Sequence, residues 1–84
     1  MAAVVTLYTM GGNADGDRAR EFLKAKGVAF EERDVGKDPK ASGELFLLAR
    51  CIFVPTLVIG GKAFCGFAIN QAKIEKALAD LKGA

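Results

Sequence analysis

The sequence has no histidine and no tryptophan, and neither sign of charge is in strong excess. Without imidazole groups, histidine acid–base catalysis, histidine-ligated metal sites and histidine-based catalytic triads are excluded. Twelve Lys and Arg against ten Asp and Glu leave a net charge of +2, so we expect no nucleic-acid partner. The 84 residues, 51% of them hydrophobic, are enough for one small domain, 1–84, with its own core.

Cysteine is scarce, and long hydrophobic runs are lacking. Cys51 and Cys65 are too few for a secreted disulfide scaffold or a Cys₄ zinc site, and they do not form a Cys-x-x-Cys pair. The most apolar stretch, 52–69, is interrupted by Pro55 and falls short of the ~20 apolar residues that span a bilayer. Residues 1–10 lack the features of a signal peptide. We therefore expect a cytoplasmic protein with no metal and no membrane partner.

Hydrophobic patterning predicts alternating strands and helices. The expected strands are 4–9, 28–35, 54–59 and 62–65, and the expected helices are 17–26, 38–50 and a C-terminal segment ending at Gly83. On the second helix the apolar positions Ala41, Leu45 and Leu48 fall on one face. The order predicts an α/β fold in which a parallel βαβ unit is followed by an antiparallel hairpin, giving a four-stranded mixed sheet with three helices.

Several short motifs along these elements match a known family. They are Leu7-Tyr8-Thr9, Arg20-Glu21-Phe22-Leu23 with Lys26-Gly27-Val28, Asp34-Val35 with Lys37-Asp38-Pro39, Val54-Pro55-Thr56, and Gly60-Gly61-Lys62. Together with the element order, they make the chain resemble the glutaredoxins, and within them the small hydrogen-donor redoxins that serve ribonucleotide reductase. The resemblance covers nearly the whole length. It implies a thioredoxin-like, glutaredoxin-type βαβαββα fold and a thiol–disulfide oxidoreductase that acts in electron transfer and redox homeostasis.

The resemblance also implies where the site lies. In that family the proline of Val54-Pro55-Thr56 is cis, and the backbone of the preceding residue pairs with a bound peptide or glutathione. The two positions of the family's Cys-x-x-Cys motif then fall on Asn13 and Gly16, neither of which is a thiol. Asn13 can still cap the first helix, but an amide cannot attack a disulfide. Thiol exchange at these two positions is therefore excluded.

The charged glutathione contacts of the family are missing as well. Met10 stands where glutaredoxins often carry a lysine, and Ala68 and Ile69 stand where they carry an acidic pair. The resemblance therefore predicts at most weak glutathione binding and no cofactor. The segment Cys65-Gly66-Phe67 is instead similar to the Ser-Gly-Phe of the hydrogen-donor redoxins, which bind glutathione poorly and take electrons from thioredoxin reductase.

Any exchange would have to use the two remaining thiols. If the expected hairpin forms, Cys65 lies opposite Thr56 and one residue from Pro55, while Cys51 precedes Pro55 by four residues. Both are candidate catalytic residues; the alternatives are that Cys65 is a small core residue and that Cys51 is a helix-end residue packed under the sheet. A bond between them needs Cα atoms within ~7 Å and hence a sharp bend, because five extended residues span up to ~16 Å.

The glycine-rich loop 11–17 invites two further interpretations, and its residues disfavour both. A phosphate loop needs Lys and Ser or Thr where this chain has Asp17 and Arg18. A calcium loop needs a closing glutamate where this chain has Phe22. A capped helix start is the simpler interpretation.

Three functions follow from the sequence. The first is a glutaredoxin-family redox protein whose exchange uses Cys51 or Cys65. The second is a redox-inactive module that binds a peptide or protein in the groove at Pro55. The residues expected to form that groove are Asn13, Asp15, Val54, Pro55, Thr56, Gly66 and Phe67. The third is a structural or regulatory protein that associates through the same face. For the protein itself we expect a monomer with a protein or peptide partner.

Overall fold

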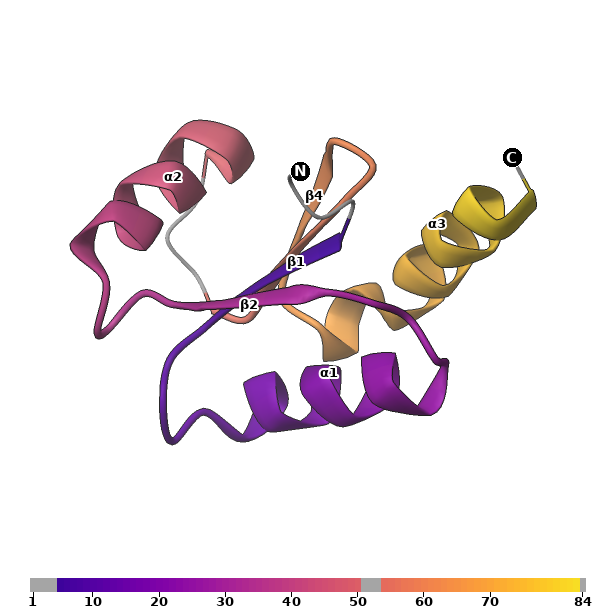
Figure 1. Ribbon diagram of the computed structural model, residues 1–84, viewed down its shortest axis with the longest axis horizontal. Helices are drawn as coiled ribbons and strands as arrows, with labels where there is room; N and C mark the ends of the chain where they lie inside the picture. Colours follow the sequence, from indigo (N-terminus) through magenta and orange to yellow (C-terminus); the bar gives the residue numbers. More distant parts are fainter. Residues whose placement is uncertain (1–4, 51–53, 84) are drawn as a thin grey trace.

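The computed structural model describes residues 5–50 and 54–83, which form a four-stranded sheet with helices on both faces (Figure 1). The strands are β1 (Val5–Thr9), β2 (Glu31–Asp34), β3 (Thr56–Ile59) and β4 (Lys62–Cys65). Their order is β2-β1-β3-β4, with β1 parallel to β2 and antiparallel to β3, and β3 antiparallel to β4. The mixed sheet, its parallel crossover and its hairpin confirm the α/β fold expected from the sequence.

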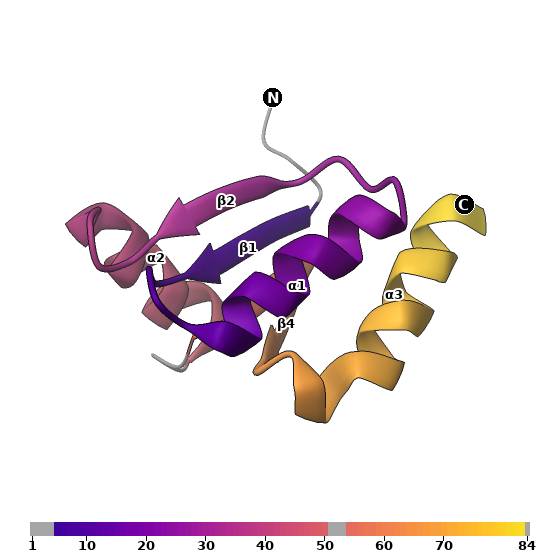
Figure 2. The same ribbon diagram turned by 90° about the horizontal axis from the view of Figure 1, so that it is seen from below.

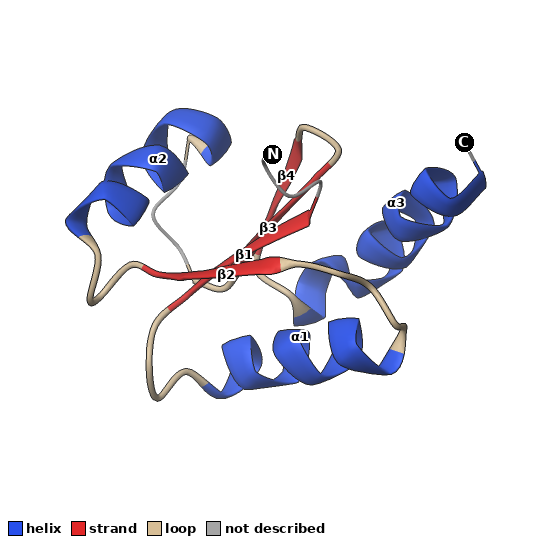
Figure 3. Cartoon of the chain, viewed as in Figure 1, coloured by secondary structure: helices blue, strands red, loops and turns tan. Residues whose placement is uncertain are grey.

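The helices lie in two layers. α1 (Ala14–Ala25) and α3 (Gln71–Gly83) cover one face of the sheet, and α2 (Pro39–Ala49) covers the other (Figures 1, 2 and 3). A short 3₁₀ helix, η1 (Ala68–Asn70), leads into α3. α1 begins earlier than predicted because Asn13 caps it, and α2 begins at the expected Asp38-Pro39 cap. Within the described ranges, no helix has the length and hydropathy needed to cross a membrane.

Two apolar clusters hold the layers together. The larger cluster joins the sheet to α1 and α3 and consists of Val5, Leu7, Ala19, Leu23, Leu57, Ile59, Phe67, Ile74 and Leu78. The smaller one lies under α2 and consists of Tyr8, Ala41 and Leu45. Because neighbouring strand residues point to opposite faces, Leu7 enters the first cluster and Tyr8 the second. β1 is therefore buried on both sides and provides a rigid centre for the sheet.

The apolar face of α2 is only partly covered: Ala41 and Leu45 are buried, and Leu48 is not. Leu48 is 58% exposed, and the neighbouring Phe46 and Leu47 are 53% and 73% exposed. Ala41 and Leu45 suffice to complete the small cluster around Tyr8, so the apolar stripe of α2 extends further along the helix than the core beneath it. Helical periodicity identified the face but not the length over which it is covered.

The sheet topology brings two loops to one end of the molecule. β1 and β3 run antiparallel with Tyr8 opposite Thr56, so the loop that follows β1 meets the loop that precedes β3. The first of these loops leads into the start of α1, and the second contains Pro55. The candidate site lies at this end of the sheet.

Candidate functional site

The loop before β3 has the backbone conformation that the resemblance implied. The Val54–Pro55 peptide bond is cis. The Pro55 side chain is buried, and its carbonyl oxygen accepts a hydrogen bond from Gly66 N–H at 2.8 Å. The Asn70 amide donates to the carbonyl oxygens of Cys65 and Gly66 at 2.8 and 3.0 Å. These bonds fix the Cys65–Gly66 segment beside the proline loop.

Cys65 is disulfide-bonded and half-buried. It lies opposite Thr56 in the β3–β4 register, as the hairpin predicted. Its Sγ is 4.0 Å from the carbonyl oxygen of Ala49, at the end of α2. The one other cysteine of the sequence, Cys51, lies outside the described residues, and so do the predictions made for it. Cys65 is therefore not the isolated core thiol of the alternative interpretation.

Asn13 connects the start of α1 to the proline loop. Its Oδ1 accepts a hydrogen bond from Gly16 N–H at 2.8 Å, which is the capping role predicted from the sequence. Its Nδ2 donates to the Val54 carbonyl oxygen at 3.3 Å. One side chain thus satisfies a free N–H of the helix and engages a backbone acceptor of the loop.

Gly16 lies directly against the end of β1. A Cβ atom added at Gly16 would clash with the Oγ1 of Thr9. Thr9 is only 2% exposed, and its Oγ1 has no hydrogen-bond partner among the described residues. The sequence reasoning missed Thr9. A glycine inside a helix, where glycine is unfavourable, signals such a close approach, but the predicted helix began at residue 17 and did not include Gly16. A side chain at position 16 would require Thr9 to move or to be replaced by a smaller residue.

Asp15 joins the first turn of α1 to the start of η1. Its Oδ2 accepts hydrogen bonds from the N–H groups of Phe67 and Ala68 at 3.2 and 3.4 Å. Its Oδ1 is buried and has no hydrogen-bond partner in the described part of the chain. Free N–H groups at a helix start favour negative charge. Asp15 supplies that charge from within the chain, so an anionic ligand would have to displace it.

A cavity of about 430 Å³ opens beside the disulfide-bonded Cys65. Its walls are formed by Asp15, Val54, Cys65, Gly66 and Ile69. Its volume lies within the range of roughly 300–1,000 Å³ that small-ligand sites occupy. Of the other predicted groove residues, Pro55 and Thr56 are buried below it, and Phe67 faces a different cavity. Ile69, which is 86% exposed, is a wall residue that the sequence reasoning did not select.

The site offers little charged chemistry. No group of three or more His, Cys, Asp or Glu side chains in the described ranges is arranged to hold a metal ion. The pKa shifts of Tyr8 and Glu32 arise away from the cavity: burial, with a hydrogen bond to Glu44, raises the pKa of Tyr8, and hydrogen bonds from Arg20 lower the pKa of Glu32. The cavity is lined by the Asp15 carboxylate, the apolar side chains of Val54 and Ile69, Gly66 and the disulfide-bonded Cys65.

Comparison with known proteins identifies the family to which this fold and site belong. The glutaredoxin family model matches residues 5–64. The chain belongs to the glutaredoxin family. A point mutant of the thioredoxin-like protein BC3987 is 33% identical, with a TM-score of 0.83 over 90% of this chain and 95% of that one. The glutaredoxin from Archaeoglobus fulgidus is 27% identical, with a TM-score of 0.81 over 90% and 86%.

A glutaredoxin–glutathione complex from buckwheat has the same fold at 14% identity, with a TM-score of 0.76 over 96% of this chain and 78% of that one. No protein of curated function matches the chain in sequence. Within the glutaredoxin family, then, this chain keeps the thioredoxin-like fold and the cis proline, while Asn13 and Gly16 stand where the resemblance placed the thiols.

Proposed function

We propose that this glutaredoxin-family protein acts in thiol–disulfide exchange through the disulfide at Cys65 instead of through a Cys-x-x-Cys motif at the start of α1. The observation that carries the proposal is that Cys65 lines the cavity next to the cis-proline loop and is held there by the Asn70 hydrogen bond to its carbonyl oxygen. A partner thiol that enters the cavity would reach this disulfide without any unfolding of the sheet.

The exchange needs two thiols from a partner protein. The first, as thiolate, attacks one sulfur of the disulfide; a mixed disulfide forms and the other sulfur leaves as a thiolate. The second partner thiol then attacks the mixed disulfide and releases the remaining sulfur. The partner's two thiols become a disulfide, and the protein gains two thiols. The nucleophile is supplied by the partner, so no thiol at Asn13 or Gly16 is required.

The experiment is a redox titration in dithiothreitol buffers, with thiols trapped by iodoacetamide and counted by mass spectrometry. We expect a reduction potential between about −270 and −120 mV, the range of exchange proteins. Cys65→Ser and Cys51→Ser should each abolish exchange, and Asn13→Ser should leave it unchanged. A potential below about −300 mV, typical of structural disulfides, would contradict the proposal.

The alternative function is a redox-inactive module that binds a peptide in the same cavity. The exposed Ile69 in the cavity wall favours it, because an apolar side chain of a partner could pack there. Peptide binding that persists in the Cys51→Ser, Cys65→Ser double variant would support this function over exchange. For either function we propose a monomeric, cytoplasmic protein with a protein or peptide partner and without glutathione as cofactor, since Asp15 already occupies the N–H groups at the start of η1.

A further inference from the structure

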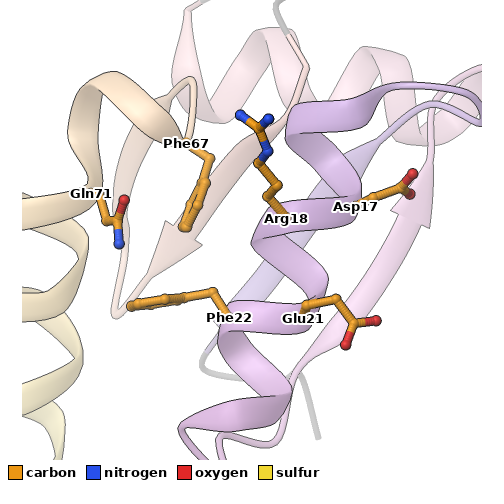
Figure 4. Close-up of a pocket in the computed structure, with 6 residues that line it drawn as sticks. All are labelled: Asp17, Arg18, Glu21, Phe22, Phe67 and Gln71. Carbon is orange, nitrogen blue, oxygen red and sulfur yellow. The ribbon is translucent and has the colours of Figure 1, made fainter.

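A second cavity, of about 480 Å³, opens between α1 and the segment that leads into α3 (Figure 4). The residues that line it are Asp17, Arg18, Glu21, Phe22, Phe67 and Gln71. None of them lines the cavity beside Cys65. The volume again falls in the range of roughly 300–1,000 Å³ expected of a small-ligand site. This second cavity is called the aromatic cavity below.

Two phenylalanines form its apolar wall. The ring centroids of Phe22 and Phe67 lie 5.2 Å apart, with 59° between the ring planes. Phe67 is only 5% exposed, so the wall is anchored in the main core. The ammonium group of Lys26 lies 5.4 Å from the Phe22 ring centroid and supports that ring. The wall is preformed and ready to pack against an apolar group.

Three charged side chains line the cavity, and of these only Arg18 lies on the same side of α1 as the aromatic wall. Figure 4 shows the carboxylates of Asp17 and Glu21 on the side of α1 that is turned away from Phe67 and Gln71, and Arg18 on the side that faces Phe67. Asp17 is also paired with Arg20 at 2.9 Å. Arg18 forms no ion pair with any described residue. Its guanidinium is available to bind a carboxylate through two parallel hydrogen bonds.

The spacing of these groups identifies the ligand. Arg18 and Phe22 are four residues apart on α1, which puts their Cβ atoms about 5–6 Å from each other. A carboxylate and an apolar side chain that branch from the same Cα fit such a spacing. In an internal Asp or Glu residue the carboxylate is the side chain itself, so the same Cα carries no apolar side chain. In a C-terminal apolar residue, one Cα carries both groups. We propose that the aromatic cavity binds the apolar C-terminal residue of a partner polypeptide.

Each part of that residue has a counterpart in the cavity. Arg18 binds the terminal carboxylate, and Phe22 and Phe67 pack against the side chain. Gln71 is exposed on the opposite wall, where its amide can hydrogen-bond the last peptide group of the partner. The proposal needs no disulfide and therefore stands apart from the exchange function.

The test uses two peptides, N-acetyl-Gly-Gly-Phe with a free carboxylate and the same peptide as a C-terminal amide. Each is titrated into the full chain labelled with ¹⁵N. We expect the acid to shift the amide signals of Arg18, Phe22, Phe67 and Gln71, and the amide form to bind at least about tenfold more weakly, because it loses a charge-assisted contact. Arg18→Gln should weaken binding of the acid by a similar factor. Lys24→Gln removes one positive charge from α1 at a residue that does not line the aromatic cavity, so it is the matched control and should leave binding unchanged.

The proposal would be overturned by equal binding of the two peptides, or by no binding of either peptide at millimolar concentration. It would also be overturned by an Arg18→Gln variant that binds the acid as well as the unchanged protein does. Signal changes confined to Val54, Gly66 and Ile69 would also overturn it, because they would place the ligand in the cavity beside Cys65. Cys65→Ser should abolish exchange and leave peptide binding intact, so the two proposals fail separately.

Discussion

The two sides of the cavity beside Cys65 differ in how much of the glutaredoxin pattern they keep. On the strand side, the Val54–Pro55 bond is cis, as the family resemblance implied, and Gly66 N–H donates a hydrogen bond to the Pro55 carbonyl oxygen. On the helix side, polar groups of the first turn of α1 form hydrogen bonds to the rest of the chain: Asn13 to the Val54 carbonyl, and Asp15 to the N–H of Phe67. The chain has the glutaredoxin fold, whereas Asn13, Asp15 and Gly16 around the start of α1 carry no thiol, so the fold alone does not determine the chemistry of this site.

The helix side of the cavity and the strand side should therefore contribute differently, the first to stability and the second to disulfide exchange. The first turn of α1 braces the loop before β3 and the start of η1, so changes there should alter stability. Cys65 carries the chemistry proposed above, so changes there should alter exchange. Substitutions at Gly16, Asn13 and Asp15 should therefore lower the free energy of unfolding, in that order of size.

Gly16→Ala should give the largest loss of stability. The new Cβ meets the buried Thr9 Oγ1 within the packed end of β1, and overpacking of this kind costs about 1–3 kcal/mol. Urea unfolding of the purified variant measures the loss. The matched control is Gly43→Ala in α2, where an added Cβ has nothing within 4 Å; removing a helical glycine there should stabilise by about 0.5–1 kcal/mol.

The source of the loss can be isolated with Thr9→Ala. This change removes both the clashing hydroxyl and a buried polar atom that lacks a partner among the described residues. The Thr9→Ala, Gly16→Ala double variant should therefore be more stable than Gly16→Ala alone. If Gly16→Ala and Gly43→Ala change the free energy of unfolding equally, the clash of the added Cβ with Thr9 does not destabilise the protein.

Asn13→Ala should cost about 1 kcal/mol, and up to about 2, because α1 loses its cap. Asn13→Asp keeps the capping oxygen and removes only the N–H that donates to Val54. It should therefore destabilise less than Asn13→Ala, and the difference between the two variants reports the cap. Equal losses of unfolding free energy in the two variants would mean that the bond to Val54 provides most of the stabilisation.

Asp15→Ala should have a mostly local effect. The N–H groups of Phe67 and Ala68 lose their acceptor, so their amide hydrogen exchange should accelerate while the amides of β1 keep their protection. The global loss should be about 1 kcal/mol, the net value of a typical hydrogen bond. Asp17→Ala is the control, because it removes a first-turn carboxylate that bonds Arg20 instead. Unchanged exchange at Phe67 and Ala68 would show that Asp15 does not brace η1.

These contacts also explain which parts of the structure could be predicted. The cap at Asp38, the two-residue turn at Gly60-Gly61 and the β1 pattern are encoded by neighbouring residues, so their positions follow from the sequence. The register that sets Cys65 opposite Thr56 follows from the turn itself. These elements are the framework of the site.

The contacts that define the site depend on tertiary approach. The bond between Asp15 and Phe67 joins residues 52 positions apart, and no local pattern encodes it. The clash between an added Cβ at Gly16 and the Thr9 side chain depends on how closely α1 packs against the end of β1. Periodicity was also insufficient for Leu48, since it gives the direction of a helix face and not the extent of the core beneath it.

The smallest effect is expected far from the cavity, at the ion pair between α1 and β2. Arg20 Nε and Nη2 donate to the two carboxylate oxygens of Glu32 at 2.7 and 2.6 Å, and these bonds lower the pKa of Glu32 below its ordinary value of 4.5. A lowered folded-state pKa means that the stabilisation is complete above the unfolded value and is lost as the pH falls through the folded one. Both side chains are about one-third exposed, so solvent screening limits the pair to about 0.5–1 kcal/mol.

Glu32→Gln should therefore be less stable than the unchanged protein at pH 7 by up to about 1 kcal/mol, and the gap should close as the pH falls below the ordinary Glu value of 4.5. Thermal unfolding of both proteins between pH 7 and pH 3 measures the gap. Glu31→Gln, one residue away on β2, is the control: the Glu31 side chain is half-exposed and its oxygen lies 3.6 Å from Arg33, so this longer pair should contribute less than about 0.5 kcal/mol. A Glu32→Gln loss as large as that of Gly16→Ala would mean that the bracing at the start of α1 is no stronger than an ordinary surface contact, and the contrast between the two sides of the cavity would then lose its energetic basis.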